Sequence, residues 1–194
     1  MKRSILKNPT TGIYHVTVRG NNKEFIFDDA KGKRKYINNL KTAKEFYGFE
    51  LFAWVIMSNH VHLLIKVNHA NLPSIMHNLQ LRYSRWFNYK YNHTGHVFGG
   101  PYKVRECRDY KYFTNIIRYI HQNPERAKLS NMNEYLWCSH HDYKEHPFWG
   151  ITDTEKSHTL SHDSSNITTN NYRKFMKEKE STLPELDIEE IYIL

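Results

Sequence analysis

The chain has 194 residues, of which 39% are hydrophobic, and its 28 lysine and arginine residues against 20 acidic residues give a formal net charge of +8. This length fits one medium-sized domain, or one domain with an appendage, and the mean hydropathy of −0.76 indicates a polar surface. We expect no membrane span, because no apolar run approaches roughly 20 residues, and no secretory signal, because the basic N-terminal segment lacks an apolar stretch. Two cysteines are too few for a disulfide framework and suggest a reducing cytoplasm.

The positive charge is concentrated in the first three quarters of the chain. Residues 1–150 carry 23 basic and 11 acidic residues, whereas residues 151–194 carry five basic and nine acidic residues. A basic body rich in aromatic residues is typical of a nucleic-acid-binding protein, since lysine and arginine bind phosphates and aromatic rings stack on bases. Charge alone leaves open the alternative of a merely soluble basic protein.

The first half of the chain alternates between strand and helix patterns. Alternating β-branched and apolar residues predict strands over 13–20, 50–57 and 60–67, and Ser58–Asn59 forms a tight turn between the last two. Helically spaced apolar residues predict a helix that starts at Phe27-Asp28-Asp29, with an aspartate as its cap, and is ended by Gly48.

The second half begins with a predicted helix over 71–91 and a loop over 92–101. A fourth strand over 102–108, at a sheet edge, precedes a third helix that Asp109 caps and Pro124 ends. The remaining segments are expected to be an aromatic-rich stretch packed on the domain (130–150), a polar loop or weak helix (152–171), a short amphipathic helix (171–179) and an acidic, apolar tail (183–194).

This order of elements predicts an α+β protein. The βαββαβ series is that of a ferredoxin-like fold, an antiparallel sheet with its helices on one face, followed by a C-terminal helical or irregular extension. We expect a main domain over residues 1–145 and the extension over 146–194. The other sheet face is then free for a site, and it carries His60 and His62 if Val61, Leu63 and Ile65 pack under the helices.

Two pairs of polar residues could carry chemistry. His60 and His62 point the same way on a strand, as two ligands of a metal ion must, although a histidine pair without a ligand is the simpler reading. Tyr119 and Asn123, four residues apart, share a helix face. A tyrosine hydroxyl can attack phosphorus, and an asparagine oxygen suits Mg²⁺ or Mn²⁺, so the four could form an open three-ligand site beside a nucleophile. Alternatively, Tyr119 is an ordinary packed tyrosine.

Four segments resemble, in order and spacing, the HUH single-tyrosine transposases, and most closely the REP-associated tyrosine transposases. They are GIYHVTVRGNN (12–22), MSNHVHLL (57–64), RYIHQNPERA (118–127) and WCSHHDY (137–143), within roughly residues 10–145. The resemblance implies that His60 and His62 are metal ligands and that Tyr119 is the nucleophile. Asn123 occupies the position where relatives place a polar third ligand, often glutamine.

The resemblance also implies a reaction and a partner. Tyr119 would attack single-stranded DNA beside a hairpin, with Mg²⁺ or Mn²⁺ bound, forming a 5′-phosphotyrosine link that a later 3′-hydroxyl resolves. The protein would be a monomer or homodimer in the cytoplasm, associated with the nucleoid, and would have no membrane partner. The candidate phosphate-binding residues are Arg19, Lys103, Arg105, Arg108, Arg118 and Arg126.

Two other functions compete with this one. His15-Val16-Thr17 together with His60-Val61-His62 superficially resembles the paired motifs of 2H phosphoesterases, but His62 stands where threonine or serine is needed. The second alternative is a catalytically silent protein that binds hairpin DNA or RNA without cutting it. It predicts binding that is indifferent to replacement of Tyr119.

Overall fold

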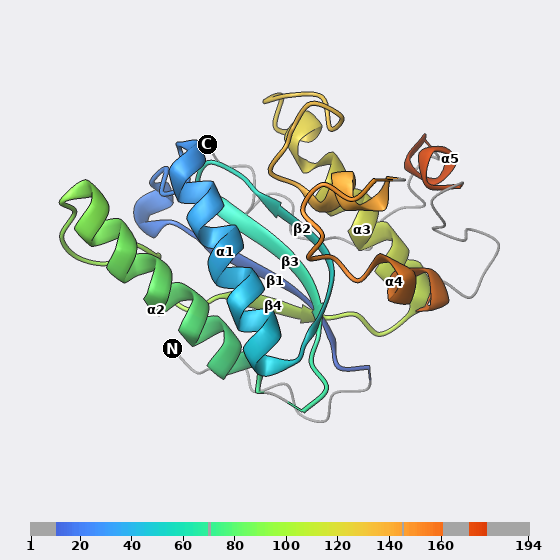
Figure 1. Cartoon of the computed structure of the whole chain (residues 1–194), viewed down its shortest axis with the longest axis horizontal. Helices are drawn as coiled ribbons and strands as arrows, with labels where there is room; N and C mark the ends of the chain where they lie inside the picture. Colours follow the sequence, from blue (N-terminus) through green and yellow to red (C-terminus); the bar gives the residue numbers. More distant parts are fainter. Residues whose placement is uncertain (1–10, 70, 145, 161–170, 178–194) are drawn as a thin grey trace.

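A computed structural model describes residues 11–69, 71–144, 146–160 and 171–177 of the chain (Figure 1). Its centre is a four-stranded sheet in the order β2-β3-β1-β4, in which all neighbouring strands are antiparallel. The strands are β1 (Ile13–Arg19), β2 (Glu50–Ile56), β3 (His60–Lys66) and β4 (Lys103–Glu106). This topology confirms the predicted α+β fold, with β4 at one edge.

The helices are α1 (Ala30–Tyr47), α2 (Leu72–Tyr91), α3 (Tyr110–Arg126), α4 (Thr154–Leu160) and α5 (Tyr172–Lys177), with short 3-10 turns η1 (Asn21–Lys23) and η2 (Ser139–Tyr143). The expected caps are confirmed. Asp29 accepts the Gly32 N–H at 2.7 Å, and Gly48 ends α1 in the left-handed region at φ 66°. In the part of the chain that is described, no helix combines the length and apolarity that crossing a membrane requires.

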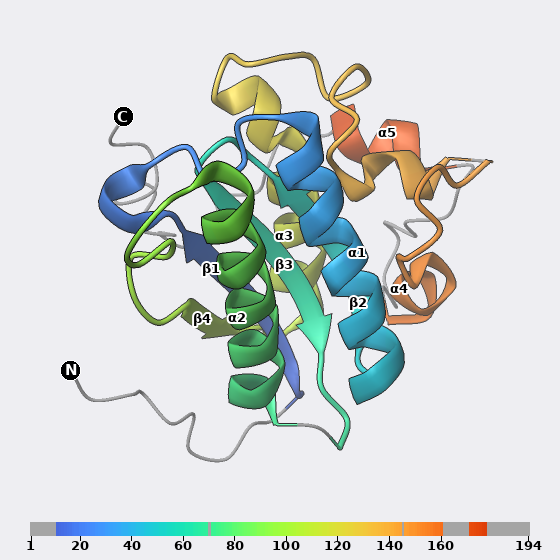
Figure 2. The ribbon, with the colours of Figure 1, turned by 60° about the vertical axis from the view of Figure 1, so that its left-hand side comes forward.

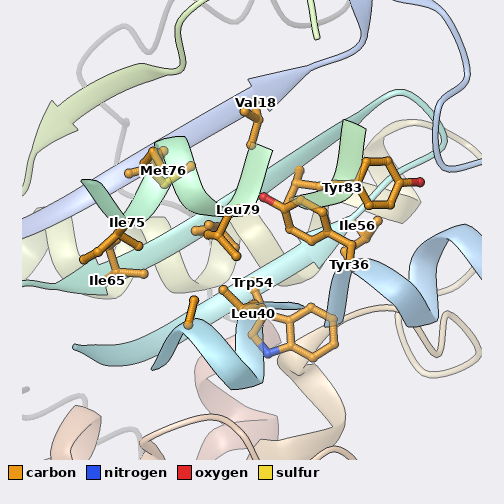
Figure 3. Close-up of a cluster of buried hydrophobic side chains, with 14 of the residues drawn as sticks. Val18, Tyr36, Leu40, Trp54, Ile56, Ile65, Ile75, Met76, Leu79 and Tyr83 are labelled. Atoms are coloured by element: carbon orange, nitrogen blue, oxygen red, sulfur yellow. The ribbon is translucent and has the colours of Figure 1, made fainter. Parts of the chain in front are cut away.

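Helices α1 and α2 cover one face of the sheet (Figure 2). Val61, Leu63 and Ile65 of β3 are fully buried beneath them, as expected from their alternation with the histidines. Figure 3 shows the middle of this core, where α2 contributes Ile75, Met76, Leu79 and Tyr83 and α1 contributes Tyr36 and Leu40. The expected side of the sheet therefore holds the main hydrophobic core.

The opposite face, expected to be free, is covered by α3 (Figure 2). Phe113, Ile116, Ile117 and Ile120 of α3 pack against the apolar residues of that face, Leu64 of β3 among them, in a second buried cluster. The prediction of a free face considered only the two helices of the βαββαβ series, which lie on the other side of the sheet. Helix α3 also has a broad apolar face, and exposing that face to water would cost free energy. It therefore packs against the apolar sheet face that α1 and α2 leave uncovered.

Two predicted boundaries also differ. Helix α3 ends two residues after Pro124, at Arg126, so the proline lies in its last turn, where the Ala127 N–H bonds to the Asn123 carbonyl at 3.0 Å. Strand β4 is shorter than expected, because only residues 103–106 form its ladder with β1. Propensity reasoning places the ends of elements poorly, because fraying and tertiary contacts decide them.

The outer edge of β2 is closed by the chain that follows α3. The Ile56 N–H bonds to the Trp137 carbonyl at 2.9 Å, and the Trp54 N–H bonds to the Ser139 hydroxyl at 2.8 Å. Further along, Asp153 accepts the Leu51 N–H at 2.8 Å. These acceptors satisfy backbone donors of an edge strand and leave less of that edge for pairing with another chain.

A buried chain of hydrogen bonds ties α3, η2 and α5 together. Asn133 accepts from His140 Nε2 at 3.1 Å, so the Tyr172 hydroxyl donates to His140 Nδ1 at 2.6 Å. The same hydroxyl lies 2.7 Å from His121 Nδ1, and His121 Nε2 lies 2.7 Å from the hydroxyl of Ser139, which donates to the Trp54 carbonyl at 3.1 Å. Each imidazole in this chain is consistent with its neutral form.

Acid is expected to weaken the fold through His140. Burial, and then the nearby Lys144, lower its pKa from 6.5 to about 3 in the folded protein. The unfolded state therefore takes up this proton first, and the free energy of unfolding falls as the pH drops from about 6.5 towards about 3. His140→Gln should show a shallower fall over that range in urea unfolding measured at a series of pH values. An equally steep fall would contradict the assignment.

Candidate functional site

The register of β1 against β3 gathers the site on the α3 side of the sheet. Thr17 lies opposite His62, and Arg19 lies opposite His60. Because side chains alternate along a strand, both histidines project from the same face, as the sequence predicts. His62 is fully buried and His60 is 8% exposed.

Helix α3 brings Tyr119 and Asn123 onto this pair. The ring centroids of Tyr119 and His62 are 5.5 Å apart with the rings nearly perpendicular, and those of His60 and His62 are 4.9 Å apart. The Asn123 side chain interacts with His60 and favours the charged form of that imidazole, against the effect of burial. The two polar pairs, distant in sequence, thus meet in one cluster.

His60 is held in a defined tautomer by its neighbour Asn59. The Asn59 amide nitrogen donates to the Lys23 carbonyl at 3.2 Å, which fixes the amide so that its oxygen faces His60 Nδ1 at 2.6 Å. That oxygen only accepts, so Nδ1 carries the hydrogen and Nε2 keeps its lone pair. Asn59 was expected only to form a turn with Ser58, and its contact with His60 was not predicted.

His62 is contacted at Nδ1 by two residues of β1. His15 Nε2 lies 3.0 Å away and Thr17 Oγ1 lies 3.1 Å away, and the rings of His15 and His62 stack with centroids 5.2 Å apart. Neither residue was among the predicted site residues. The sequence signal for both residues was the His15-Val16-Thr17 alternation on the first strand, which lies in a segment that carries the family resemblance but was given no site role.

The three imidazoles of the cluster are neutral at neutral pH. Burial, and then the positive charge of Arg105, lower the pKa of His15 to about 4. Burial and Arg19 lower the pKa of His60 to about 4, and burial with His60, His15 and Arg19 holds the pKa of His62 well below its usual value. A neutral imidazole is the form that binds a cation.

The residues present fit a divalent cation. The Nε2 atoms of His60 and His62 and the amide nitrogen of Asn123 are buried and make no hydrogen bond of ordinary geometry. The described ranges contain no cluster of three or more histidine, cysteine and acidic residues suited to a metal. An amide oxygen such as that of Asn123 is a donor of the kind that Mg²⁺ and Mn²⁺ accept beside two imidazoles.

The predicted phosphate-binding residues differ in how close they lie to the cluster of His60, His62 and Tyr119. Lys103 and Arg105 of β4 lie opposite Thr17 and His15, so they share the face of the histidines, and both are exposed. The Arg126 guanidinium carbon lies 5.4 Å from the centroid of the Tyr119 ring. Arg108 lies beyond the strand with a 76% exposed side chain and pairs with Glu106 at 3.4 Å.

Arg118 is not presented to DNA in this structure, contrary to expectation. Its side chain is buried, donates from Nε to the Phe175 carbonyl of α5 at 3.0 Å, and lies 4.2 Å from the centroid of the Phe175 ring. Its place on α3, one residue before Tyr119, turns it away from the site by about 100°. Arg118 therefore anchors α5 on α3.

Replacing Arg118 should cost stability. Arg118→Met keeps much of the volume but leaves the Phe175 carbonyl without its charged donor, so the free energy of unfolding should fall by about 1.5–3 kcal/mol. Arg108→Met, at an exposed position, should change it by less than about 0.5 kcal/mol. Chemical denaturation of both variants measures the difference, and equal effects would show that Arg118 has no anchoring role.

Comparisons with known proteins find a family model and solved structures to which this chain is similar. The model of the family described as "Transposase IS200 like" matches residues 10–123. A structure of the REP-associated tyrosine transposase bound to a REP hairpin is similar with a TM-score of 0.58 and 16% identity, covering 72% of this chain and 84% of that one. A candidate transposase from Deinococcus radiodurans R1 has a TM-score of 0.43 and 21% identity, covering 63% of this chain and 97% of that one. No curated protein matches in sequence.

Proposed function

The chain belongs to the IS200-like transposase family, and on that premise we propose that it nicks and rejoins single-stranded DNA through a covalent bond to Tyr119. The observation that carries the proposal is the meeting of Tyr119, His60, His62 and Asn123 in one buried cluster. A nucleophile beside a set of neutral imidazoles and an amide suits phosphoryl transfer.

The proposed reaction keeps the energy of the phosphodiester bond. The Tyr119 oxygen attacks phosphorus and loses its proton, while the bond from phosphorus to the 3′-oxygen breaks and that oxygen leaves as a 3′-hydroxyl. The product is a 5′-phosphotyrosine link. In the second step another 3′-hydroxyl attacks the same phosphorus, the tyrosine oxygen leaves and regains a proton, and the strand is rejoined without a nucleotide cofactor.

Positive side chains surround the reacting group. Arg126 lies over the Tyr119 ring, and Arg19 acts electrostatically on both His60 and His62. These cations stabilise negative charge on the attacking oxygen and on the phosphate. Tyr119 has no exposed surface, so a phosphate reaches its hydroxyl only when the side chains over it move.

His60, His62 and Asn123 would hold the divalent cation, Mg²⁺ or Mn²⁺. Once bound, the cation would polarise the scissile phosphate and help to position it. The chain's own contribution is to present two lone pairs on neutral imidazoles from one rigid strand, with the asparagine oxygen approaching from α3. Three protein ligands leave positions for phosphate and water oxygens.

The proposed partner is single-stranded DNA next to a hairpin. A protein with the same fold is bound to a REP hairpin. In this chain, Lys103 and Arg105 lie on β4 beside His15 and Thr17, so their charges extend from the cluster to the sheet edge. We propose that the DNA backbone follows these side chains, with Arg19 and Arg126 nearest the scissile phosphate and Arg108 further out.

Tyr119→Phe should abolish a covalent protein–DNA adduct while leaving hairpin binding intact, because it removes only the attacking oxygen. The measurement is incubation with hairpin-bearing single-stranded DNA and Mg²⁺ or Mn²⁺, followed by a denaturing gel. Tyr112→Phe is the matched control: Tyr112 is also a buried tyrosine of α3, with the guanidinium of Arg105 5.1 Å from its ring centroid. The control should retain the adduct.

Two results would overturn the covalent mechanism. An adduct that persists in Tyr119→Phe would place the nucleophile elsewhere. Tight hairpin binding by the unmodified protein, with no adduct on a panel of hairpins, would favour a non-cutting hairpin-binding protein instead.

Chelating the divalent cation, or replacing the histidines proposed to bind it, should reduce DNA cutting more than DNA binding. EDTA, His60→Ala and His62→Ala should each remove most of the adduct, because the phosphate is no longer polarised or positioned, while contacts with the DNA backbone remain. Adduct yield and hairpin affinity are measured on the same samples. Cutting that is fully retained in EDTA would contradict the role of the cation and would favour metal-free phosphoesterase chemistry.

A further inference from the structure

We infer that His15 and Thr17 are positioning residues that hold His62 in the tautomer able to bind a cation, with hydrogen on Nδ1 and a lone pair on Nε2. This inference rests on the proposed function, since it assigns His62 as a ligand. Both residues lie on β1 and contact His62 at Nδ1, whereas Nε2 is the nitrogen that would bind the cation.

The geometry comes from strand pairing. Thr17 lies directly opposite His62, whereas His15 lies opposite Leu64 and reaches His62 diagonally. Their polar atoms lie 3.1 Å and 3.0 Å from the same nitrogen, His62 Nδ1. His62 has no exposed surface, so bulk water does not reach it to replace these partners.

The state of His62 Nε2 indicates whether Nδ1 donates or accepts in its contacts with His15 and Thr17. His62 Nε2 is buried and makes no ordinary hydrogen bond within the described residues. A buried N–H without an acceptor is rarer in proteins than a buried lone pair without a donor. The hydrogen is therefore better placed on Nδ1, where His15 Nε2 and the Thr17 hydroxyl both accept it.

His15 is an unusual residue for its place. It is 5% exposed, on a sheet face where Ile13 of the same strand and Leu64 opposite belong to the apolar cluster. A buried polar group is costly unless it is hydrogen-bonded, and the contact from its Nε2 goes to His62. Its ring also stacks on that of His62 at an angle of 24°, which restricts the orientation of the imidazole.

His60 and His62 are therefore each contacted at Nδ1, but by residues of different elements. Asn59, in the bend before β3, accepts from Nδ1 of His60, and β1 supplies the acceptors for Nδ1 of His62. Outer partners of this kind fix the tautomer and ring orientation of metal-binding histidines.

The first test measures Mn²⁺ affinity in the full-length protein without DNA, by electron paramagnetic resonance of free Mn²⁺. The double variant His15→Phe/Thr17→Val keeps the ring and the side-chain shape but removes both acceptors. It should weaken Mn²⁺ binding by about 10- to 100-fold. His15→Gln alone, which restores an acceptor, should bind closer to the unmodified protein than His15→Phe does.

Two controls separate positioning from general damage. Thr114→Val removes a hydroxyl that donates to the Lys111 carbonyl of its own helix at 3.1 Å, and should leave Mn²⁺ affinity unchanged. Urea unfolding compares the stability of all variants. A merely structural His15 would lower stability without the rescue of Mn²⁺ affinity by His15→Gln.

A second measurement reads the tautomer directly. In ¹⁵N-labelled protein, long-range ¹H–¹⁵N spectra distinguish a protonated from a bare ring nitrogen. We expect His62 with hydrogen on Nδ1 both without a cation and with Mg²⁺, and a mixture of tautomers in His15→Phe/Thr17→Val. A bare Nδ1 in the unmodified protein would overturn the inference.

The outcomes also separate this inference from the proposed function. If His62→Ala abolishes Mn²⁺ binding but a folded His15→Phe/Thr17→Val protein binds normally, only the positioning role fails. If His62→Ala itself leaves Mn²⁺ binding unchanged, the metal site fails, and the positioning role fails with it.

Discussion

The pairing of β1 with β3 is the constraint on which the rest of the site depends. It places Thr17 opposite His62 and Arg19 opposite His60, and it sends the neighbouring valines and leucines into the core under α1 and α2. A slip of one residue would exchange the two faces, burying the imidazoles among aliphatic side chains. The same burial that stabilises the fold therefore also fixes the position of the chemistry.

Local patterns predicted much of the fold. The alternation of β3 placed His60 and His62 on one face, and the spacing of Tyr119 and Asn123 placed them on one side of α3, because both periods are intrinsic to the backbone. The docking of α3 across the supposedly open face could not be predicted, since it depends on which apolar surfaces remain after α1 and α2 have packed. Arg118 was misplaced for the same reason, because its partner Phe175 is far along the chain.

The partners of His60 and His62 were harder to predict than the two histidines themselves. Asn59 was expected to serve a turn, and its additional contact with His60 depends on the loop containing Lys23, which holds the amide in one orientation. The contact of His15 with His62 is a diagonal between strands, and it requires the register to be known. Sequence spacing reports neighbours along one element, whereas these contacts cross from one element to another.

The complete burial of Tyr119 has a consequence for substrate choice. If the open form is a minor population, the apparent affinity for DNA is the intrinsic affinity multiplied by that fraction, so a one-in-a-hundred open form binds about a hundredfold more weakly. A short single-stranded DNA that contacts only the cluster gains too little binding free energy to offset this conformational cost. On the proposed function, a longer DNA that also engaged Lys103 and Arg105 would gain binding free energy outside the cluster, so the burial of Tyr119 would select for extended substrates.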